Sequence, residues 1–278
     1  MNHFILTRFN LRLWEKDKNN APVQTAEWLE KRFNLFETYC FPSILSQTCK
    51  DFKWICLFDI DTPDKYKNKI QGYCKLMKGF IPCFLGKEET LRFFEYFKEQ
   101  IKQYADSNDE NLITTYLDND DCLRIDYIEY IQNLSTHSSH NTIFSFKYGL
   151  QYFTTYNLAV RIPYPNNHFL SYYEKYNSNI KTVWGFSHFY IFQYKNINFN
   201  CINNERNPMW IEVVHENNVD NDVKMTLSLK LISSKYFLNN YGINRILNRK
   251  ASICNYIFKL GPRFINQVIR RLKNKIGK

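Results

Sequence analysis

The sequence contains no C-x-x-C pair among its eight cysteines and no run of 18 apolar residues. The first absence excludes the spacing of a typical zinc site and favours reduced thiols in a cytosolic protein. The second excludes a helix that crosses a membrane. No signal peptide is visible, because Met1 to His3 lead directly into a strand-like run, and we therefore expect a cytoplasmic protein.

Acidic residues are absent after Asp222, so the formal charge of +10 is unevenly placed. Ten of the 37 Lys and Arg residues lie between Arg245 and Lys278, and the other 27 balance the 27 acidic residues of the chain. The body of the protein therefore has no electrostatic footprint for nucleic acid. Low-complexity linkers and internal repeats are also missing, which predicts one compact domain, 1–240, and a basic tail, 241–278.

The tail carries apolar residues at helical spacing, edged by its Lys and Arg residues. This pattern is typical of an amphipathic helix that lies on an anionic membrane surface. It predicts peripheral contact with the cytoplasmic face of the inner membrane. The alternative is a terminal helix that packs on the domain and keeps its cations solvated.

The first half of the chain alternates short apolar runs with amphipathic stretches, which predicts a doubly wound α/β sheet. Strands are expected at 3–7, 52–58, 80–85 and 112–117, and helices at 25–47, 65–77, 88–104 and 124–134. Pro42 is expected to break the first helical stretch in two. Later segments rich in β-forming residues predict that the second half completes a mixed sheet; they are 142–147, 151–156, 158–162, 182–186 and 209–214.

The most informative motif is Tyr116-Leu117-Asp118-Asn119-Asp120-Asp121, where three carboxylates follow an apolar strand within four residues. Carboxylates crowded in this way repel one another unless a cation or several donors lie among them. Oxygen ligands on a short loop suit Mg²⁺ or Mn²⁺, which also bind diphosphates. The simpler interpretation is an acidic turn that caps the following helix, a role that Asp121 in particular is suited to.

Other polar residues also lie directly after predicted strands. Arg8 follows the first strand and Asp59 and Asp61 follow the second, as Asp118 and Asp120 follow the fourth. Ligands of doubly wound sheets bind beyond the carboxyl ends of the strands. We therefore expect these five side chains at one edge of the sheet.

Three segments, in order, resemble family-2 glycosyltransferases of the GT-A fold. They are Thr7-Arg8-Phe9-Asn10, the run from Pro42 to Asp64 with its Ser-x-x-x-Gln-Thr and acidic strand end, and the D-x-D loop at Asp118 to Asp120. Two later segments, His168 to Glu174 and Met209 to Asn218, are similar to the bacterial putative rhamnosyltransferase family. The resemblance covers about residues 3–220, and it implies a nucleotide-sugar half at 1–140 and an acceptor half at 141–240.

The resemblance implies an inverting transfer of a sugar from a nucleotide diphosphate sugar to a saccharide or lipid-linked saccharide of the cell surface. It implies that Asp120 is the main ligand of Mn²⁺ or Mg²⁺ and that Asp118 meets the ribose or reaches the metal through water. Asp59 would bind the nucleobase and ribose, and Arg8 a phosphate. His215, in a family-like segment, would bind the metal or the diphosphate. The family name implies a rhamnosyl donor with thymidine diphosphate.

The general base is less well defined, because the Glu-Asp pair usual in family-2 enzymes is missing. Glu212 is the first candidate, since it alternates with Ile211 and Val213 along a predicted strand and so faces away from them. Glu205 and Glu174 follow in rank, and His188 is a weaker candidate for the site. Trp210 shares the face of Glu212 and could floor an acceptor site.

Two other functions compete with glycosyl transfer. Asp59-Ile60-Asp61 begins like the D-x-D-x-T motif of haloacid-dehalogenase-type phosphatases, but Pro63 stands where that motif has Thr. A non-catalytic module that binds anionic membrane surfaces through its tail is the second alternative, and for it the clustered aspartates would be dispensable.

Overall fold

The structure is a computed structural model that describes the whole chain except residues 17–21, 216–229, 233, 236, 248 and 261–278. Its first half alternates strands and helices as predicted. The strands are β1 (Asn2–Arg8), β2 (Lys53–Asp59), β3 (Phe80–Leu85) and β4 (Asn111–Tyr116). The helices after β2 and β3 are α3 (Asp64–Leu76), α4 (Lys87–Leu91) and α5 (Phe93–Tyr104). The stretch predicted as one helix at 88–104 is thus interrupted at Arg92.

These four strands lie side by side at one end of a seven-stranded sheet, with β3 at its edge; the order is β10-β6-β9-β4-β1-β2-β3. β1 lies between β2 and β4 and is parallel to both, with Leu6 opposite Ile55 and Tyr116. β9 (Leu170–Lys175) runs antiparallel between β4 and β6 (Thr142–Phe146), and β10 (Asn198–Ile202) pairs with β6. The predicted doubly wound, mixed sheet is therefore confirmed.

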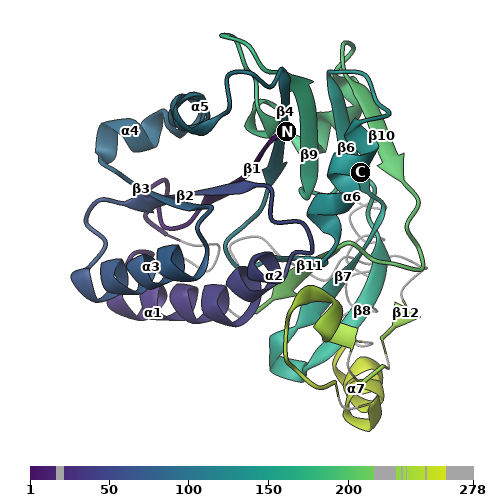
Figure 1. The fold of residues 1–278 in the computed structure, drawn as a ribbon. Coiled ribbons are helices and arrows are strands. Elements are labelled where there is room, and N and C mark those ends of the chain that lie inside the picture. Colours follow the sequence, from purple (N-terminus) through teal and green to yellow (C-terminus); the bar gives the residue numbers. More distant parts are fainter. Residues whose placement is uncertain (17–21, 216–229, 233, 236, 248, 261–278) are drawn as a thin grey trace, which may run out of the picture.

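Helices cover both faces of this sheet, which explains why its strands are apolar on both sides. Figure 1 shows α1 (Ala26–Leu35) and α3 on one side of β1–β3, and α4 and α5 on the other. Phe33 and Phe36 pack with Trp54 in the first layer, and Phe93 and Phe97 with Leu57 in the second. With apolar cores on both faces, polar side chains gather at the strand ends.

The helical stretch at 25–47 stays continuous, so the expected break at Pro42 is wrong. A π-helical turn, η1 (Phe36–Cys40), joins α1 to α2 (Phe41–Leu45), and the N–H of Phe41 donates to the carbonyl of Phe36. Proline lacks an N–H and clashes with the carbonyl four residues earlier in a regular α-helix. The wider turn ahead of Pro42 accommodates that clash without ending the helix.

A second sheet was not predicted. Its order is β12-β8-β7-β11-β5, with β5 (Cys122–Leu123), β7 (Tyr148–Phe153), β8 (Leu158–Pro163), β11 (Trp210–Val214) and β12 (Lys230–Leu231). The strand expected at 151–156 begins earlier and gives way to a 3-10 turn at Thr154–Tyr156. The segment 182–186 is also not a strand, because its centre is the 3-10 turn η3 (Val183–Gly185). Helix α6 (Tyr127–Ser135) follows β5 and confirms the helix expected there.

The chain continues to pack on the second sheet beyond residue 240. Tyr241, Ile243 and Leu247 are buried in a cluster with Leu150 and Ile211. Helix α7 (Arg249–Asn255) and a π turn (Tyr256–Leu260) follow, while 261–278, which is 18 of the 38 residues of the predicted tail, lies outside the described residues. The division at 240 and the helical tail stay predictions. Within the described part of the chain, no helix is both long and apolar enough to span a bilayer.

Candidate active site

The acidic loop, residues 117–121, connects the end of β4 to the short strand β5. Leu117 is buried, so it anchors the loop, and Asn119 ties the loop to its neighbours. The side-chain amide of Asn119 donates to the carbonyl of Phe9 over 2.6 Å, and its oxygen accepts from Arg32 on α1 over 3.1 Å. The loop is therefore held against the end of β1.

Asp120 has two basic partners. Its Oδ2 accepts from the guanidinium of Arg32 over 2.8 Å and lies 2.9 Å from Nε2 of His215, just after β11. All three side chains are at most 10% exposed. Burial alone would raise the pKa of Asp120, but Arg32 and His215 together outweigh burial and lower the pKa to about 2. Asp120 is thus an ionised carboxylate in the interior.

Asp121 has a different environment, and the expectation that it caps the next helix is wrong. Its Oδ1 accepts from the N–H of Val213 over 2.9 Å, and its Oδ2 lies 2.8 Å from Nε2 of His168. Burial and the charge of Asp120 raise the pKa of Asp121 to about 7, although His168 opposes the change. In the same pair, burial lowers the pKa of His168, but Asp121 outweighs it and the pKa is raised.

Asp118 completes the acidic loop and is the most accessible of its carboxylates, with 36% of the side chain exposed. Its Oδ1 accepts from the hydroxyl of Tyr116 over 2.8 Å, and its Oδ2 lies 3.9 Å from Nε2 of His168. Asp118, Asp121 and His168 together offer three possible ligand atoms within 4.8 Å of one another. Two carboxylates of the loop therefore each pair with a histidine from elsewhere in the chain, Asp120 with His215 and Asp121 with His168.

Asp59 and Asp61 lie at the end of β2 and share one cation. Arg12 contacts Asp59 over 3.0 Å and Asp61 over 3.1 Å, and the N–H of Asp59 donates to the side-chain oxygen of Asn10. Because β1 lies between β2 and β4, Asp59 and the acidic loop occupy the same edge of the sheet. The predicted gathering of these strand-end acids is confirmed, and their individual roles stay predictions.

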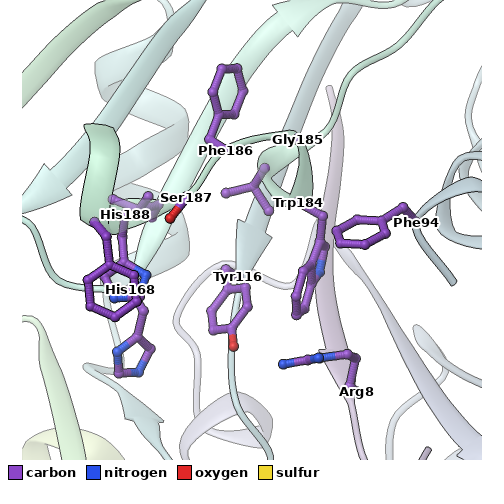
Figure 2. A pocket seen from close by; sticks show the side chains of 12 residues that line it. Arg8, Phe94, Tyr116, His168, Trp184, Gly185, Phe186, Ser187 and His188 are labelled. Carbon is purple, nitrogen blue, oxygen red and sulfur yellow. The ribbon is translucent and has the colours of Figure 1, made fainter. Parts of the chain in front are cut away.

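Arg8, at the end of β1, packs among aromatic rings. Its guanidinium carbon lies 4.4 Å from the ring centroid of Trp184 and 5.2 Å from that of Phe93. Figure 2 shows the guanidinium directed toward the hydroxyl of Tyr116, within a cavity of about 330 Å³. Its predicted contact with a donor phosphate stays a prediction.

The three glutamates ranked as candidates for the general base all accept hydrogen bonds or form ion pairs within the protein. Glu212 is fully buried on β11 and accepts from the amide of Gln151 over 2.9 Å. Glu174 accepts from the N–H groups of Lys181 and Thr182, and Glu205 pairs with Arg161. Trp210 is buried and stacks on Phe169, so it belongs to the core and does not floor an open site.

A second cavity, of about 400 Å³, adjoins His215 on the side of α1. Lys31 from α1 and Arg245 contribute cations to its lining, and Thr154 and Thr155 contribute hydroxyls. His168 and His188 line the first cavity instead. The acidic loop therefore bonds to one histidine from each cavity, His215 through Asp120 and His168 through Asp121.

Three functional candidates were missed in the sequence: Arg12, Arg32 and His168. Arg32 had a detectable signal, since it follows Leu29 by three residues and adjoins Phe33 on the buried stripe of α1. A cation on such a stripe needs a buried anion. His168 lies just before β9, and only its contact with Asp121, 47 positions away, shows its importance.

Comparison with known proteins identifies a family. The model of the family described as "Putative rhamnosyl transferase" matches residues 6–227. No curated protein matches the chain in sequence. Among solved structures, TarS of S. aureus is similar at 10% identity and a TM-score of 0.43, over 77% of this chain and 37% of that chain.

Two further structures are similar. TarS 1-349 of S. aureus in complex with UDP has 9% identity and a TM-score of 0.42, over 77% of this chain and 60% of that one. Mouse xyloside xylosyltransferase 1 in its apo form has 10% identity and a TM-score of 0.32, over 52% of each chain. The chain thus spans between 37% and 60% of the solved chains it resembles.

Proposed function

The chain belongs to a family of glycosyltransferases, the putative rhamnosyl transferases, and on that premise we propose that it transfers a sugar from a nucleotide diphosphate sugar to a saccharide hydroxyl with inversion. The observation that carries this proposal is that Asp59 and the acidic loop lie at the same edge of the sheet, with two histidines bonded to the loop. Membership of this family also argues against the phosphatase and the non-catalytic module.

The acidic loop fits the divalent cation that the proposal includes, either Mn²⁺ or Mg²⁺. We propose Asp120 and His215 as its ligands, because their Oδ2 and Nε2 atoms are 2.9 Å apart and because His215 lines the cavity to which Lys31 and Arg245 contribute cations. Bound there, the cation would neutralise the charge that develops on the leaving diphosphate. The second ligand set is Asp118, Asp121 and His168, which is favoured by its three clustered ligand atoms and by the absence of an arginine partner among the contacts described for it.

For the donor we propose that Asp59, held by Arg12, binds the nucleobase and ribose, and that Asp118 binds the ribose. A carboxylate whose partners fix its position can accept from sugar hydroxyls without further ordering. The family name supports a rhamnosyl group as the transferred sugar, and we propose thymidine diphosphate as its carrier. Contact of the C-terminal tail with an anionic membrane, which would bring a lipid-linked acceptor close, also remains a proposal.

The sequence points to Glu212 as the general base, but the full burial of its side chain prevents direct contact with an acceptor hydroxyl. We propose instead that His168 is the base; Asp121 outweighs burial in raising the pKa of His168, and the charges of Asp118 and Glu212 add smaller contributions. His168 lines the first cavity, and Asp121 orients its ring. In this arrangement His168 takes the proton from the acceptor hydroxyl, as a carboxylate-supported histidine can.

Thermal unfolding with a panel of nucleoside diphosphates, with and without Mn²⁺, tests the donor site. We expect one nucleotide to raise the melting temperature, and Mn²⁺ to strengthen the effect. Mn²⁺ binding measured by electron paramagnetic resonance separates the two ligand sets. Loss of binding in His215→Ala but not in His168→Ala supports Asp120 and His215, whereas the reverse result identifies the second set. If no nucleotide stabilises the protein with or without Mn²⁺, the proposed function is wrong.

A further inference from the structure

Arg8 contributes its guanidinium to the lining of the first cavity. We call this cavity the Arg8 cavity; its volume is about 330 Å³, within the range of about 300–1,000 Å³ typical of small-molecule sites. Arg8 lies against the rings of Trp184, Phe93 and Trp14 at 4.4, 5.2 and 5.5 Å. Among the residues that the structure describes, no carboxylate forms a salt bridge with Arg8, and its Nε, buried from solvent, has no hydrogen-bond partner. A guanidinium in such surroundings is stabilised by an anion that enters from outside.

The walls of the Arg8 cavity suit a sugar ring. Trp184 and Phe94 form one side, as Figure 2 shows, and the histidines His168 and His188 lie on the other. The indole Nε1 of Trp184 is a second buried donor without a partner in the described part of the chain. Aromatic faces pack on the C–H faces of a pyranose, while donors at the edge bind its oxygens.

The position of the Arg8 cavity favours the acceptor over the nucleotide. Tyr116 lines it and donates to Asp118, and His168 lines it and bonds to Asp121, so the cavity opens beside the acidic loop. The described residues that line it include none from β2 or β3, whereas Asp59, which is proposed to bind the nucleobase and ribose, is the last residue of β2. A hydroxyl on a sugar in this cavity would lie next to His168.

We propose that the Arg8 cavity binds an acceptor sugar that carries an anionic group, a carboxylate or a phosphate, with Arg8 as its specificity-determining cation and Trp184 as its stacking surface. This inference rests on the proposed function, and it adds the chemical class of the acceptor. A uronic acid and a sugar phosphate share the required chemistry, and the two are separated by experiment.

Saturation-transfer NMR titration of the intact chain with single sugars tests the proposal without turnover. The anionic probes are methyl β-D-glucuronide and D-glucose 6-phosphate, and methyl β-D-glucoside is the neutral control. We expect one anionic probe to bind about tenfold more tightly than the glucoside, because a charge-assisted contact is added. Arg8→Gln should remove this preference, Arg8→Lys should keep part of it, and Trp184→Ala should weaken all three probes.

Matched controls distinguish the acceptor site from the donor site. Arg92→Gln alters an exposed arginine on the neighbouring helix junction and should leave the preference intact. Thermal stabilisation by a nucleoside diphosphate should persist in Arg8→Gln, which also shows that the variant folds. A saturating nucleoside diphosphate should leave the binding of the probe unchanged or strengthen it.

Three results would overturn the proposal. The first is equal binding of anionic and neutral sugars, and the second is failure of every anionic probe to bind. The third is displacement of the probe by the nucleoside diphosphate, which would assign Arg8 to the donor. None of these results bears on whether nucleotide sugars are consumed at the acidic loop, so the proposed function would fail separately.

Discussion

His215 Nε2 lies 2.9 Å from Oδ2 of Asp120, although 95 positions separate the two residues in the chain. The contact joins the end of β4 in the first sheet to the end of β11 in the second. Arg32 contacts the same carboxylate oxygen from α1. Three elements therefore converge on Asp120, and substitutions at this position should affect both stability and activity.

Asp120→Asn should cost about 3–5 kcal/mol of the free energy of unfolding, because Arg32 would be left as a buried charge without its partner. Asp118→Asn, at a side chain 36% exposed, should cost less than about 1 kcal/mol. Urea denaturation of both variants measures the difference. Equal costs would mean that the Arg32 pair adds no stability to the fold.

The rate of sugar transfer should rise with pH through the raised pKa of His168, because only the neutral imidazole can accept a proton. Asp121→Asn removes the anion that raises this pKa, so the acidic limb of the rate profile should move to lower pH. His168→Gln should remove the limb altogether. A profile of kcat/KM against pH for the three proteins checks this, and an unchanged limb in Asp121→Asn would exclude His168 as the base.

The stability of the metal-free protein should fall as pH rises between about 4 and 7. The pKa of Asp121 is raised from 3.8 to about 7 in the folded state, so the folded protein binds more protons than the unfolded chain in this window. The raised pKa of His168 acts in the same direction, since its contribution is fully present at low pH and is lost as pH rises through that value. Asp121→Asn should flatten the dependence measured by urea denaturation in the presence of a chelator, and a slope unchanged by the substitution would contradict the assignment.

The packing between Gly149 and Trp210 should tolerate no added carbon. A Cβ built on Gly149 would lie 1.9 Å from the indole of Trp210, so Gly149→Ala should cost about 1–3 kcal/mol or more. Gly72→Ala on α3 is the matched control, because nothing lies within 4 Å of its added Cβ. It should stabilise the protein by about 0.5–1 kcal/mol through helix propensity. Thermal unfolding of both variants decides whether the second sheet is packed as described.

The first half of the fold could be predicted because its apolar strands and amphipathic helices carry local periodicity. The second half could not be predicted to the same extent, since pairing of β11 with both β7 and β5 depends on contacts distant in sequence. The segment around Trp184 contains β-forming residues, yet it folds into a turn whose indole packs on Arg8 and Tyr116. Tertiary packing overrode local preference there.

The same distinction applies to the site. Asp59, Asp118 and Asp120 could be placed together because strand ends of a parallel sheet meet at one edge. The burial of Glu212 and the packing of Arg8 against aromatic rings could not be predicted in this way. Both depend on which face of a strand meets the neighbouring layer. Asp121 looked like a helix cap from its position, but its two oxygens bond across to Val213 and His168.

The most direct test of the central claim is the initial rate at which thymidine diphosphate rhamnose and related nucleotide sugars are consumed, measured against Mn²⁺ concentration. The wild-type protein should consume one of them in a Mn²⁺-dependent reaction. Asp120→Asn and His215→Ala should each lower that rate by about 10²–10³-fold, the loss typical when one stabiliser of transition-state charge is removed. Consumption that is unaffected by Mn²⁺ and by both substitutions would contradict the account.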